Sequence, residues 1–206
     1  MEENTTASYN TAIGFKALRA NTTGTKNTAV GNDALLQTTT GSYNVALGTQ
    51  ALSSNTTGAS NVAVGQNALG SNTTANDNVA VGQDALVSNT TGASNVALGA
   101  YAADALTTSS GVIAIGHNAA GQATNNANQS VCIGGEAGAQ MNETKNTLIG
   151  FYAGKDLDSG EGNTAVGNYA FASDQNSTVT GANNTCIGRQ AGQVISSGQK
   201  NVQLGS

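Results

Sequence analysis

Asn61-Val62-Ala63-Val64-Gly65 is one copy of a short unit that recurs along the whole chain. Its closing glycine returns every 17 residues, six times in succession, between Gly14 and Gly116. The later spacings are 18, 16, 17, 21 and 17 residues, ending at Gly205, so 12 copies cover the 206 residues. A nearly constant period of this length is typical of repeat proteins, in which stacked neighbours complete each unit.

The alternation of side chains within the unit predicts a β-strand. The residue before the glycine is always Ile, Val or Leu, the residue two earlier is Thr, Val or Ile, and Ala stands between them in eight of 12 copies. Bulky residues alternating with a small one give a strand with one bulky and one small face. We expect the residues before the glycine to form the core of the repeat: Ile13, Val30, Leu47, Val64, Val81, Leu98, Ile115, Ile133, Ile149, Val166, Ile187 and Leu204.

The rest of each repeat predicts a second short strand and two turns. Ala follows the glycine by three residues in all 11 copies that have that position, and Leu often comes next. Segments such as Asn55-Thr56-Thr57-Gly58 are turn material, because Asn and Gly adopt positive φ at low cost. Coils of this kind stack at ~4.8 Å and would form a rod of roughly 55 Å.

An asparagine four residues before the glycine is present in ten of 12 copies. Stacked coils place such residues directly above one another, so their side-chain amides should form a ladder. The ladder is expected at Asn10, Asn27, Asn44, Asn61, Asn78, Asn95, Asn146, Asn163, Asn184 and Asn201.

These patterns predict an all-β fold, a parallel β-solenoid of about 12 rungs that forms one domain over residues 1–206. Residues 10–116 hold regular rungs and residues 117–206 irregular ones. Each repeat buries only a few small side chains, and stacking alone leaves bulky positions uncovered. We therefore expect an obligate homo-oligomer with closed symmetry.

Composition excludes several other classes of protein. Only 9% of residues are charged, and the seven Lys and Arg are scattered singly at a net charge of −5, so no basic surface for nucleic acid is expected. The longest apolar runs have four residues, far short of a membrane span. The first six residues lack the features of a signal peptide.

The repeats resemble the head repeats of YadA-like trimeric autotransporter adhesins, which also occur in fibre and tail proteins of phages. The resemblance covers essentially the whole chain and implies a left-handed β-roll, with three chains side by side and their inner strands toward a common axis. The 17-residue unit is longer than the family's coil. The neck, the coiled-coil stalk and the membrane anchor of a complete adhesin have no counterpart in this sequence.

We therefore expect a non-enzymatic structural or adhesive homotrimer. It would form part of a phage virion, as a tail fibre, spike or capsid surface protein, or the head of an adhesin on a cell surface. Other virion or surface proteins would stack at either end, and repeated weak contacts would bind a surface receptor or glycan through avidity. No nucleophile, base and orienting group recur at converging positions, so neither catalysis nor a cofactor is expected.

Three tyrosines share the second position after the glycine and should recur along one surface of the stacked coils. The 21-residue copy carries an insertion, and insertions in solenoids often form binding loops. A candidate receptor surface therefore comprises Tyr101, Tyr152, Tyr169, Asn176 and Thr178. The alternatives are that the tyrosines cap the groove of a trimer and that the insertion is a tolerated bulge.

The acidic segment around Asp156, Asp158 and Glu161 is a weak candidate for a calcium site. It departs from the EF-hand pattern, so a solvated acidic turn and no metal is the expectation. Cys132 and Cys186 occupy the small middle position of the strand and should be buried free thiols.

Two further features have ordinary explanations. His117 is the only histidine and is expected to lie on the surface or in a turn. The recurring Asn-X-Ser/Thr sequons reflect turn chemistry rather than glycosylation, because no secretory signal precedes them.

Ice binding is the alternative function. Thr22, Thr39, Thr56, Thr73, Thr90 and Thr107 recur eight residues after the glycine, and a second threonine follows each of them. Stacked threonines can order water, although adjacent residues of a strand point to opposite faces, so one column at most would face ice.

Overall fold

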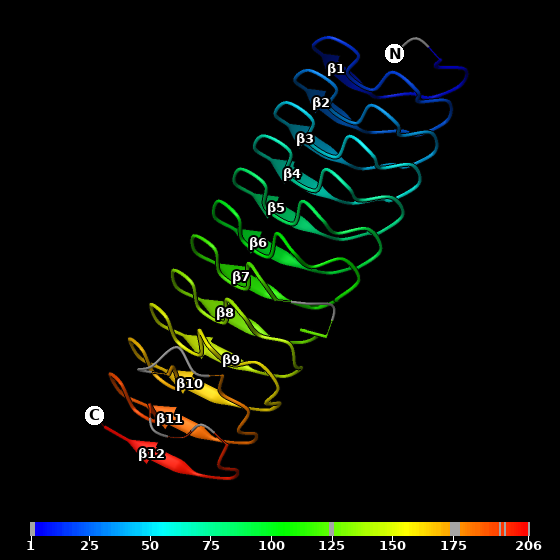
Figure 1. Ribbon diagram of the computed structural model, residues 1–206. Coiled ribbons are helices and arrows are strands. Elements are labelled where there is room, and N and C mark those ends of the chain that lie inside the picture. The colour runs from blue at the N-terminus through cyan, green and yellow to red at the C-terminus, as the bar shows by residue number, and fades with distance from the viewer. Residues whose placement is uncertain (1–2, 124–125, 174–177, 194, 196, 206) are drawn as a thin grey trace.

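The computed structural model describes residues 3–123, 126–173, 178–193, 195 and 197–205. These residues form a rod in which 12 short strands lie in one sheet, each hydrogen-bonded to the next in chain order (Figure 1). The strands are β1 (Thr11–Ile13), β2 (Thr28–Val30), β3 (Val45–Leu47), β4 (Val62–Val64), β5 (Val79–Val81), β6 (Val96–Leu98), β7 (Ile113–Ile115), β8 (Val131–Ile133), β9 (Thr147–Ile149), β10 (Thr164–Val166), β11 (Thr185–Ile187) and β12 (Val202–Leu204).

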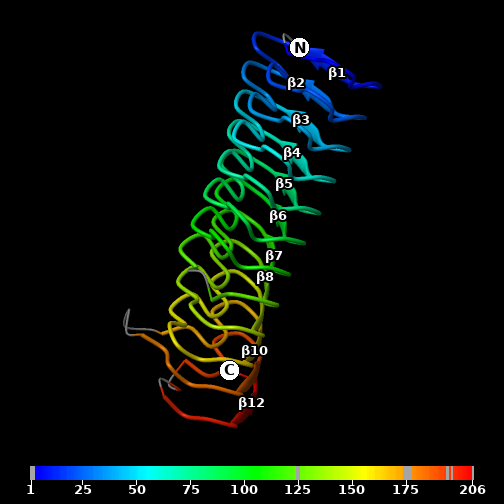
Figure 2. The ribbon, with the colours of Figure 1, turned by 90° about the vertical axis from the view of Figure 1, so that its right-hand side faces the viewer.

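Every pair of neighbouring strands is parallel, and equivalent repeat positions face one another. Val62 of β4 pairs with Val79 of β5, and Thr164 of β10 pairs with Thr185 of β11 across the 21-residue spacing. The extra residues of the irregular copies therefore lie outside the strands, and the coils stay stacked along the rod (Figure 2). The predicted all-β parallel solenoid with a period of about 17 residues is confirmed.

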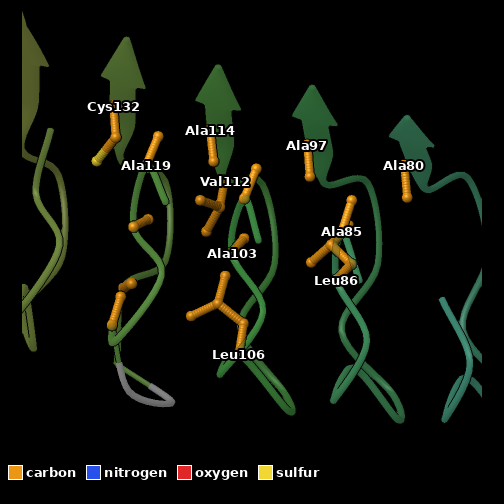
Figure 3. Packing of buried hydrophobic residues seen from close by; sticks show 14 of the residues in the cluster. Ala80, Ala85, Leu86, Ala97, Ala103, Leu106, Val112, Ala114, Ala119 and Cys132 are labelled. Atoms are coloured by element: carbon orange, nitrogen blue, oxygen red, sulfur yellow. The ribbon is translucent and has the colours of Figure 1, made fainter. Parts of the chain in front are cut away.

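The core of the coil is made mainly of alanines and leucines. The middle residue of the strand points inward and meets an alanine and a leucine from the segment after the glycine (Figure 3). In the rung of β4, Ala63, Ala68 and Leu69 are all fully buried. The middle residues of the strands and the Ala and Leu residues of the turns thus fill the interior together.

The prediction of a second strand in each repeat is wrong. The segment after the glycine is a run of turns, and two of its residues, Asn67 and Leu69 in the rung of β4, have φ of 57° and 51°. A strand needs consecutive residues in the extended region at negative φ. Alternating left-handed residues instead curl the chain, so that neighbouring Ala68 and Leu69 both reach the interior.

The residues before the glycine also need a correction, because they lie on the outer face of the sheet and not in the core of the coil. Val64 is half-buried, and Leu47 and Val81 are each 37% exposed. The middle residue faces inward, and strand alternation then points both of its neighbours outward. The correction applies to Ile13, Val30, Leu47, Val64, Val81, Leu98, Ile115, Ile133, Ile149, Val166, Ile187 and Leu204.

The asparagines four residues before the glycine join neighbouring coils. The Asn61 side chain accepts a hydrogen bond from the Asn78 backbone at 3.0 Å and donates to the Ala75 carbonyl at 2.8 Å. Both groups would otherwise lie unpaired in the interior. The column is interrupted where Val112 and Ser130 replace asparagine.

A second column of buried asparagines was not predicted. Asn72 Nδ2 donates to Asn55 Oδ1 at 3.0 Å, and Asn89 Nδ2 donates to Asn72 Oδ1 at 3.2 Å. Each of these amides also bonds the carbonyl three residues later in its own turn, as Asn55 does with Gly58 at 3.0 Å. The Asn-Thr-Thr-Gly segments therefore form turns and also connect neighbouring coils through buried hydrogen bonds.

Candidate interaction surface

The outward side chains of the 12 strands form a surface that we call the apolar strip. The outward residue before the glycine is apolar in every described strand, and the first outward residue is Thr in β1, β2, β9, β10 and β11. Both columns are apolar from β3 to β8, at Val45, Leu47, Val62, Val64, Val79, Val81, Val96, Leu98, Ile113, Ile115, Val131 and Ile133. At ~4.8 Å per rung and ~3.3 Å per residue, the strip measures roughly 50 Å by 10 Å.

One edge of the apolar strip is bordered by the residue two positions before each strand, a column that we call the leading corner. All of its members have positive φ, which turns the chain sharply into the strand. Lys26 Nζ lies 4.8 Å from the centre of the Tyr43 ring and donates to its hydroxyl at 3.1 Å. The column consists of Tyr9, Lys26, Tyr43, Ser60, Asp77, Ser94, Gly111, Gln129, Lys145, Gly162, Asn183 and Lys200.

The opposite edge is bordered by the two residues after each closing glycine, which we call the trailing corner. Its largest cluster holds Phe151, Tyr152 and Tyr169. The ring centres of Tyr152 and Tyr169 are 4.9 Å apart, and Phe151 meets Tyr152 edge-on at 4.0 Å. Such contacts fix the rings in place beside the sheet.

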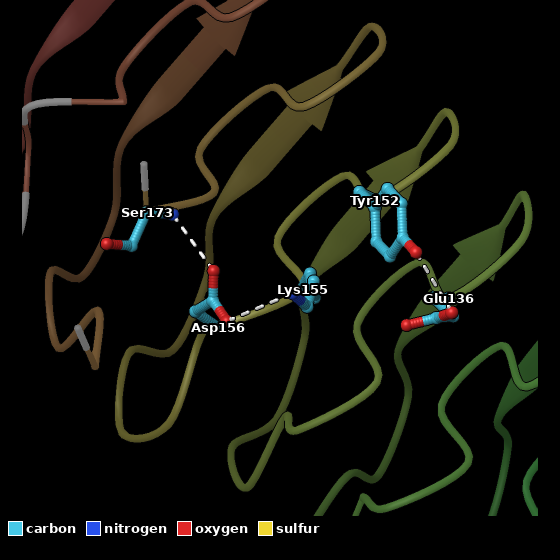
Figure 4. A network of polar contacts seen from close by, with 5 residues as sticks. All are labelled: Glu136, Tyr152, Lys155, Asp156 and Ser173. Atoms are coloured by element: carbon cyan, nitrogen blue, oxygen red, sulfur yellow. Dashed lines mark hydrogen bonds and ion pairs between the residues drawn. The ribbon is translucent and has the colours of Figure 1, made fainter. Parts of the chain in front are cut away.

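Charged groups lie near Tyr152 of this cluster (Figure 4). The Tyr152 hydroxyl donates to Glu136 Oε1 at 3.1 Å, and this bond raises the pKa of Tyr152 above its usual value. Lys155 Nζ lies 5.1 Å from the Tyr152 ring centre and 4.0 Å from Asp156 Oδ1. The trailing corner therefore offers aromatic, anionic and cationic groups within a few rungs.

Aromatic residues concentrate at the two corners. Of five tyrosines and three phenylalanines in the chain, all but the buried Phe171 lie at one corner or the other. The sequence reasoning singled out three tyrosines and missed Tyr9, Tyr43, Phe15 and Phe151. Each of these residues stands just before or just after the strand unit, and this fixed place in the repeat could have identified them.

The structure brings together only part of the expected receptor surface. Tyr152 and Tyr169 are in contact, whereas Tyr101 lies three rungs before Tyr152 and packs edge-on against His117 at 5.9 Å. Thr178 is exposed in the insertion before β11. Asn176 lies outside the described residues.

The three acidic residues suggested as a weak cation site point to separate partners. Asp156 is buried and accepts a hydrogen bond from the Ser173 backbone at 3.1 Å, while Asp158 accepts one from Asn142 Nδ2 at 2.8 Å. Glu161 is exposed. Within the part of the chain that the structure describes, no group of three or more His, Cys, Asp or Glu side chains is arranged to hold a metal ion.

Cys132 and Cys186 are buried free thiols. Burial raises the pKa of Cys132 to about 12 and also raises that of Cys186. Among the sequons, Asn21, Asn55 and Asn72 are fully buried, as is Asn89, so their side chains serve the turns. His117 is exposed at the trailing corner.

The two threonine columns differ in exposure. Thr56 is half-buried, and its hydroxyl donates to the Thr73 carbonyl of the next coil at 3.0 Å. The same bond recurs from Thr22, Thr39, Thr73 and Thr90. The exposed column consists of Thr23, Thr40, Thr57, Thr74, Thr91 and Thr108.

The described residues include no helix long and apolar enough to cross a membrane. The surface features on which a function can be based are thus the apolar strip, its two corners and the exposed threonine column. No family model, curated protein sequence or solved structure matches the chain.

Proposed function

We propose that this chain is a non-enzymatic structural and adhesive protein that associates into a homotrimer through the apolar strip. The trimer would serve as a rigid segment of a phage tail fibre, spike or capsid surface, or as the head of a cell-surface adhesin. It would be displayed on a virion or cell surface, stack on other proteins at its ends and bind a receptor or glycan by repeated weak contacts.

The observation that carries this proposal is the outward direction of the large strand residues. Val, Ile and Leu form two continuous outward columns from β3 to β8, while the middle residue of each of these strands, alanine or Cys132, points into the interior of the coil. Contiguous apolar surfaces larger than a few hundred Å² mark sites of protein association. A flat strip that runs the length of the rod fits another copy of the same rod, because both have the same length and the same rung spacing.

A trimer is favoured over other closed forms by the resemblance of the repeats to those of trimeric adhesins and by the narrowness of the strip. Each strand has only three residues. Three narrow faces turned toward one axis enclose a small core, which the Val, Ile and Leu side chains of the strip are large enough to fill.

The test is the native mass in solution, measured by light scattering coupled to size exclusion. We expect three times the chain mass of 20.3 kDa. Val64→Asp places a charge in the centre of the strip and leaves the interior of the coil unchanged. It should therefore yield a folded monomer with a β-type circular dichroism spectrum, since burying three unpaired carboxylates at one axis is strongly unfavourable.

Thr57→Asp is the matched control. Thr57 is exposed in a turn outside the apolar strip, so this variant should keep the mass of the parent protein. A parent protein that is monomeric at micromolar concentration contradicts the proposal, and so does a Val64→Asp variant with unchanged mass.

Ice binding is a second candidate, supported by the exposed threonine column, whose members repeat at the rung spacing along the regular rungs. The neighbouring column is less suited to ice, because its hydroxyls already donate to backbone carbonyls. Thermal hysteresis of the purified protein tests this candidate, and a solution with no gap between freezing and melting excludes it.

A further inference from the structure

We propose that the rod opens at one place, between β7 and β8, while the coils on either side of it stay closed. The coils of β1–β7 and the coils of β8–β12 are then two units of one rod. The contacts that decide this lie within one chain, so the inference goes beyond the proposed function and does not depend on how many copies associate.

Main-chain hydrogen bonds do not distinguish the junction of β7 and β8 from the others. The Gly134 N–H donates to the Ile115 carbonyl at 2.7 Å, and the equivalent bond between β5 and β4, from Gly82 to Val64, is 2.8 Å long. Both pairs of strands keep the same parallel register. A difference between the two junctions must therefore come from the side chains.

Buried asparagines hold the coils of β4 and β5 together. Asn61 Oδ1 accepts a hydrogen bond from the Asn78 N–H at 3.0 Å, and Asn61 Nδ2 donates to the Ala75 carbonyl at 2.8 Å. Asn72 Nδ2 donates to Asn55 Oδ1 at 3.0 Å. All four asparagines are fully buried. Each of these bonds must break before the coils separate, which makes their separation less favourable.

The four equivalent positions at the junction of β7 and β8 hold no asparagine. They are occupied by Leu106, Val112, Ala123 and Ser130, all of which are fully buried. Val112 and Leu106 are part of the apolar core (Figure 3). Their contacts are non-directional and supply none of the side-chain hydrogen bonds that join β4 to β5.

The ladder of side-chain oxygens is broken at this junction alone among those that the structure describes. At each of the other ten junctions, the backbone N–H at the ladder position donates to a side-chain oxygen of the preceding coil. The Val112 N–H still donates to Asn95 Oδ1 at 2.9 Å, and the Asn146 N–H donates to Ser130 Oγ at 3.1 Å. The ladder therefore reaches the coil of β7 and resumes at the coil of β8.

The break leaves a backbone donor unpaired. Valine has no side-chain oxygen, so the N–H of the fully buried Ser130 has no acceptor among the residues that the structure describes. A buried N–H without a partner is unfavourable, and the packing of Val112 does not satisfy it. In a stack of repeats, stability is close to a sum of terms from each unit and each junction, so the junction with fewer favourable terms opens before the others.

Native-state hydrogen exchange resolved to single amides tests the proposal on the parent protein. Gly134 and Glu136 donate across the junction of β7 and β8, and Gly82 and Asp84 are their equivalents across the junction of β4 and β5. After correction for the intrinsic rate of each amide, Gly134 and Glu136 should exchange at least about tenfold faster, because each missing hydrogen bond accounts for about fivefold.

The neighbouring junctions distinguish local opening from fraying. Gly116 donates across the junction of β6 and β7, and Gly150 donates across the junction of β8 and β9. Opening at one place makes Gly134 exchange faster than both, whereas fraying from an end of the rod makes the rate rise steadily toward that end. A steady rise from Gly116 through Gly134 to Gly150 overturns the proposal.

Val112→Asn should strengthen the junction of β7 and β8. The new side chain supplies an acceptor to the Ser130 N–H, so exchange at Gly134 should slow by about fivefold, while exchange at Gly82 should not change. Val112→Leu is the matched control. It changes the same buried residue without adding an acceptor, and it should not slow exchange at Gly134.

Asn61→Val makes the converse change at the junction of β4 and β5. It removes one acceptor and one donor from that junction, so exchange at Gly82 should become at least about tenfold faster. Exchange at Gly134 should stay at its parent value. A β-type circular dichroism spectrum shows that the variant is folded.

Two outcomes overturn the inference. One is equal exchange of Gly134 and Gly82 in the parent protein, a result that needs no variant to fold. The other is a Val112→Asn variant in which exchange at Gly134 is not slowed. The native mass has no bearing on either result, so the proposed trimer and this inference can fail separately.

Discussion

The regular rungs and the later rungs of β8, β9 and β11 fill the same interior from opposite sides, whereas the rung of β10 keeps the regular arrangement, with Ala165 in the strand and Phe171 in the turn. In the rung of β4, the strand supplies the small Ala63 and the turn supplies Leu69. In the rung of β9, the strand supplies Leu148 and the turn supplies Gly154. A Cβ atom added to Gly154 would lie 2.7 Å from Leu148 Cδ2, so the leucine occupies the space that the turn residue fills in a regular rung.

Other later rungs show the same exchange. In the rung of β8, the strand supplies Cys132 and the turn supplies Gly138. A Cβ atom on that glycine would lie 2.6 Å from the Cys132 sulfur. Cys186 and Gly192 form an equivalent pair, at 2.4 Å. Packing thus constrains the volume of each rung rather than the residue at each position. The irregular rungs are alternative solutions to one packing problem.

Exchanging the large and the small residue between strand and turn within one rung should produce the largest change in the free energy of unfolding. Leu148→Ala leaves a cavity and should lower the free energy of unfolding by about 3 kcal/mol. Gly154→Leu forces a side chain into filled space and should cost about 3 kcal/mol. The double variant Leu148→Ala/Gly154→Leu reproduces the Ala and Leu of a regular rung, so its stability should return to within about 1 kcal/mol of the parent value.

Urea unfolding followed by circular dichroism, at one fixed protein concentration, measures this cycle. The backbone at Gly154 suits the exchange, because its φ of 58° is close to the 51° of Leu69. If the two losses simply add in the double variant, the rungs do not conserve volume and the comparison fails.

The buried thiol at the same strand position should give the two regions different alkaline stability. Burial raises the pKa of Cys132 to about 12 from an ordinary 9.0, so the folded state holds this proton more tightly than the unfolded state. The stabilisation is complete below pH 9 and is lost as the pH rises toward 12. At pH 10.5 this loss should reach about 2 kcal/mol.

Cys132→Ala removes the titrating group and installs the residue of the regular rungs. We expect a cost of about 1 kcal/mol at pH 7 from the lost sulfur volume. The loss of stability between pH 9 and 10.5 should be about 2 kcal/mol smaller than in the parent protein. Equal pH dependence of the two proteins would show that the thiol does not titrate with unfolding.

The sequence was sufficient to predict the parallel ladder, because a fixed period sets register without further information. It did not reveal which face of the strand points inward. Alternation shows only that the two faces differ, and the inward direction of Ala63 depends on how the turn brings in Leu69. That turn was predicted as a second strand from its recurring Ala and Leu. Leu rarely adopts positive φ, and its repeated burial against the strand explains the conformation.

The interaction surface was predictable to a lesser degree. Tyr152 and Tyr169 were assigned to one surface from their shared repeat position, and the structure places their rings together. The leading corner was overlooked, since its members range from Tyr9 to Gly162 and share a backbone conformation rather than a chemistry. Residue type alone does not reveal such a column.

The second asparagine column gives the smallest and most local test of the comparison. The column is interrupted after Asn21 and after Asn89, whose Oδ1 atoms are buried without a hydrogen-bond partner, because the next rungs carry Thr38 and Leu106 at that position. Thr38→Asn should supply the missing donor to Asn21 and recreate the Asn-Thr-Thr-Gly turn, raising the free energy of unfolding by about 1 kcal/mol. Leu106→Asn is the matched variant in the later rungs.

Leu106→Asn offers the same hydrogen bond to Asn89 but removes a fully buried leucine from a rung whose turn otherwise buries only two alanines, Ala102 and Ala103. The lost burial of about 2 kcal/mol or more exceeds the gain of about 1 kcal/mol from the bond, so this variant should be less stable than the parent protein. Urea midpoints of the two variants should therefore move in opposite directions. If both midpoints rise, the hydrogen bond contributes more to stability at this position than the buried side-chain volume does. Packing would then not be what distinguishes the regular rungs from the later ones.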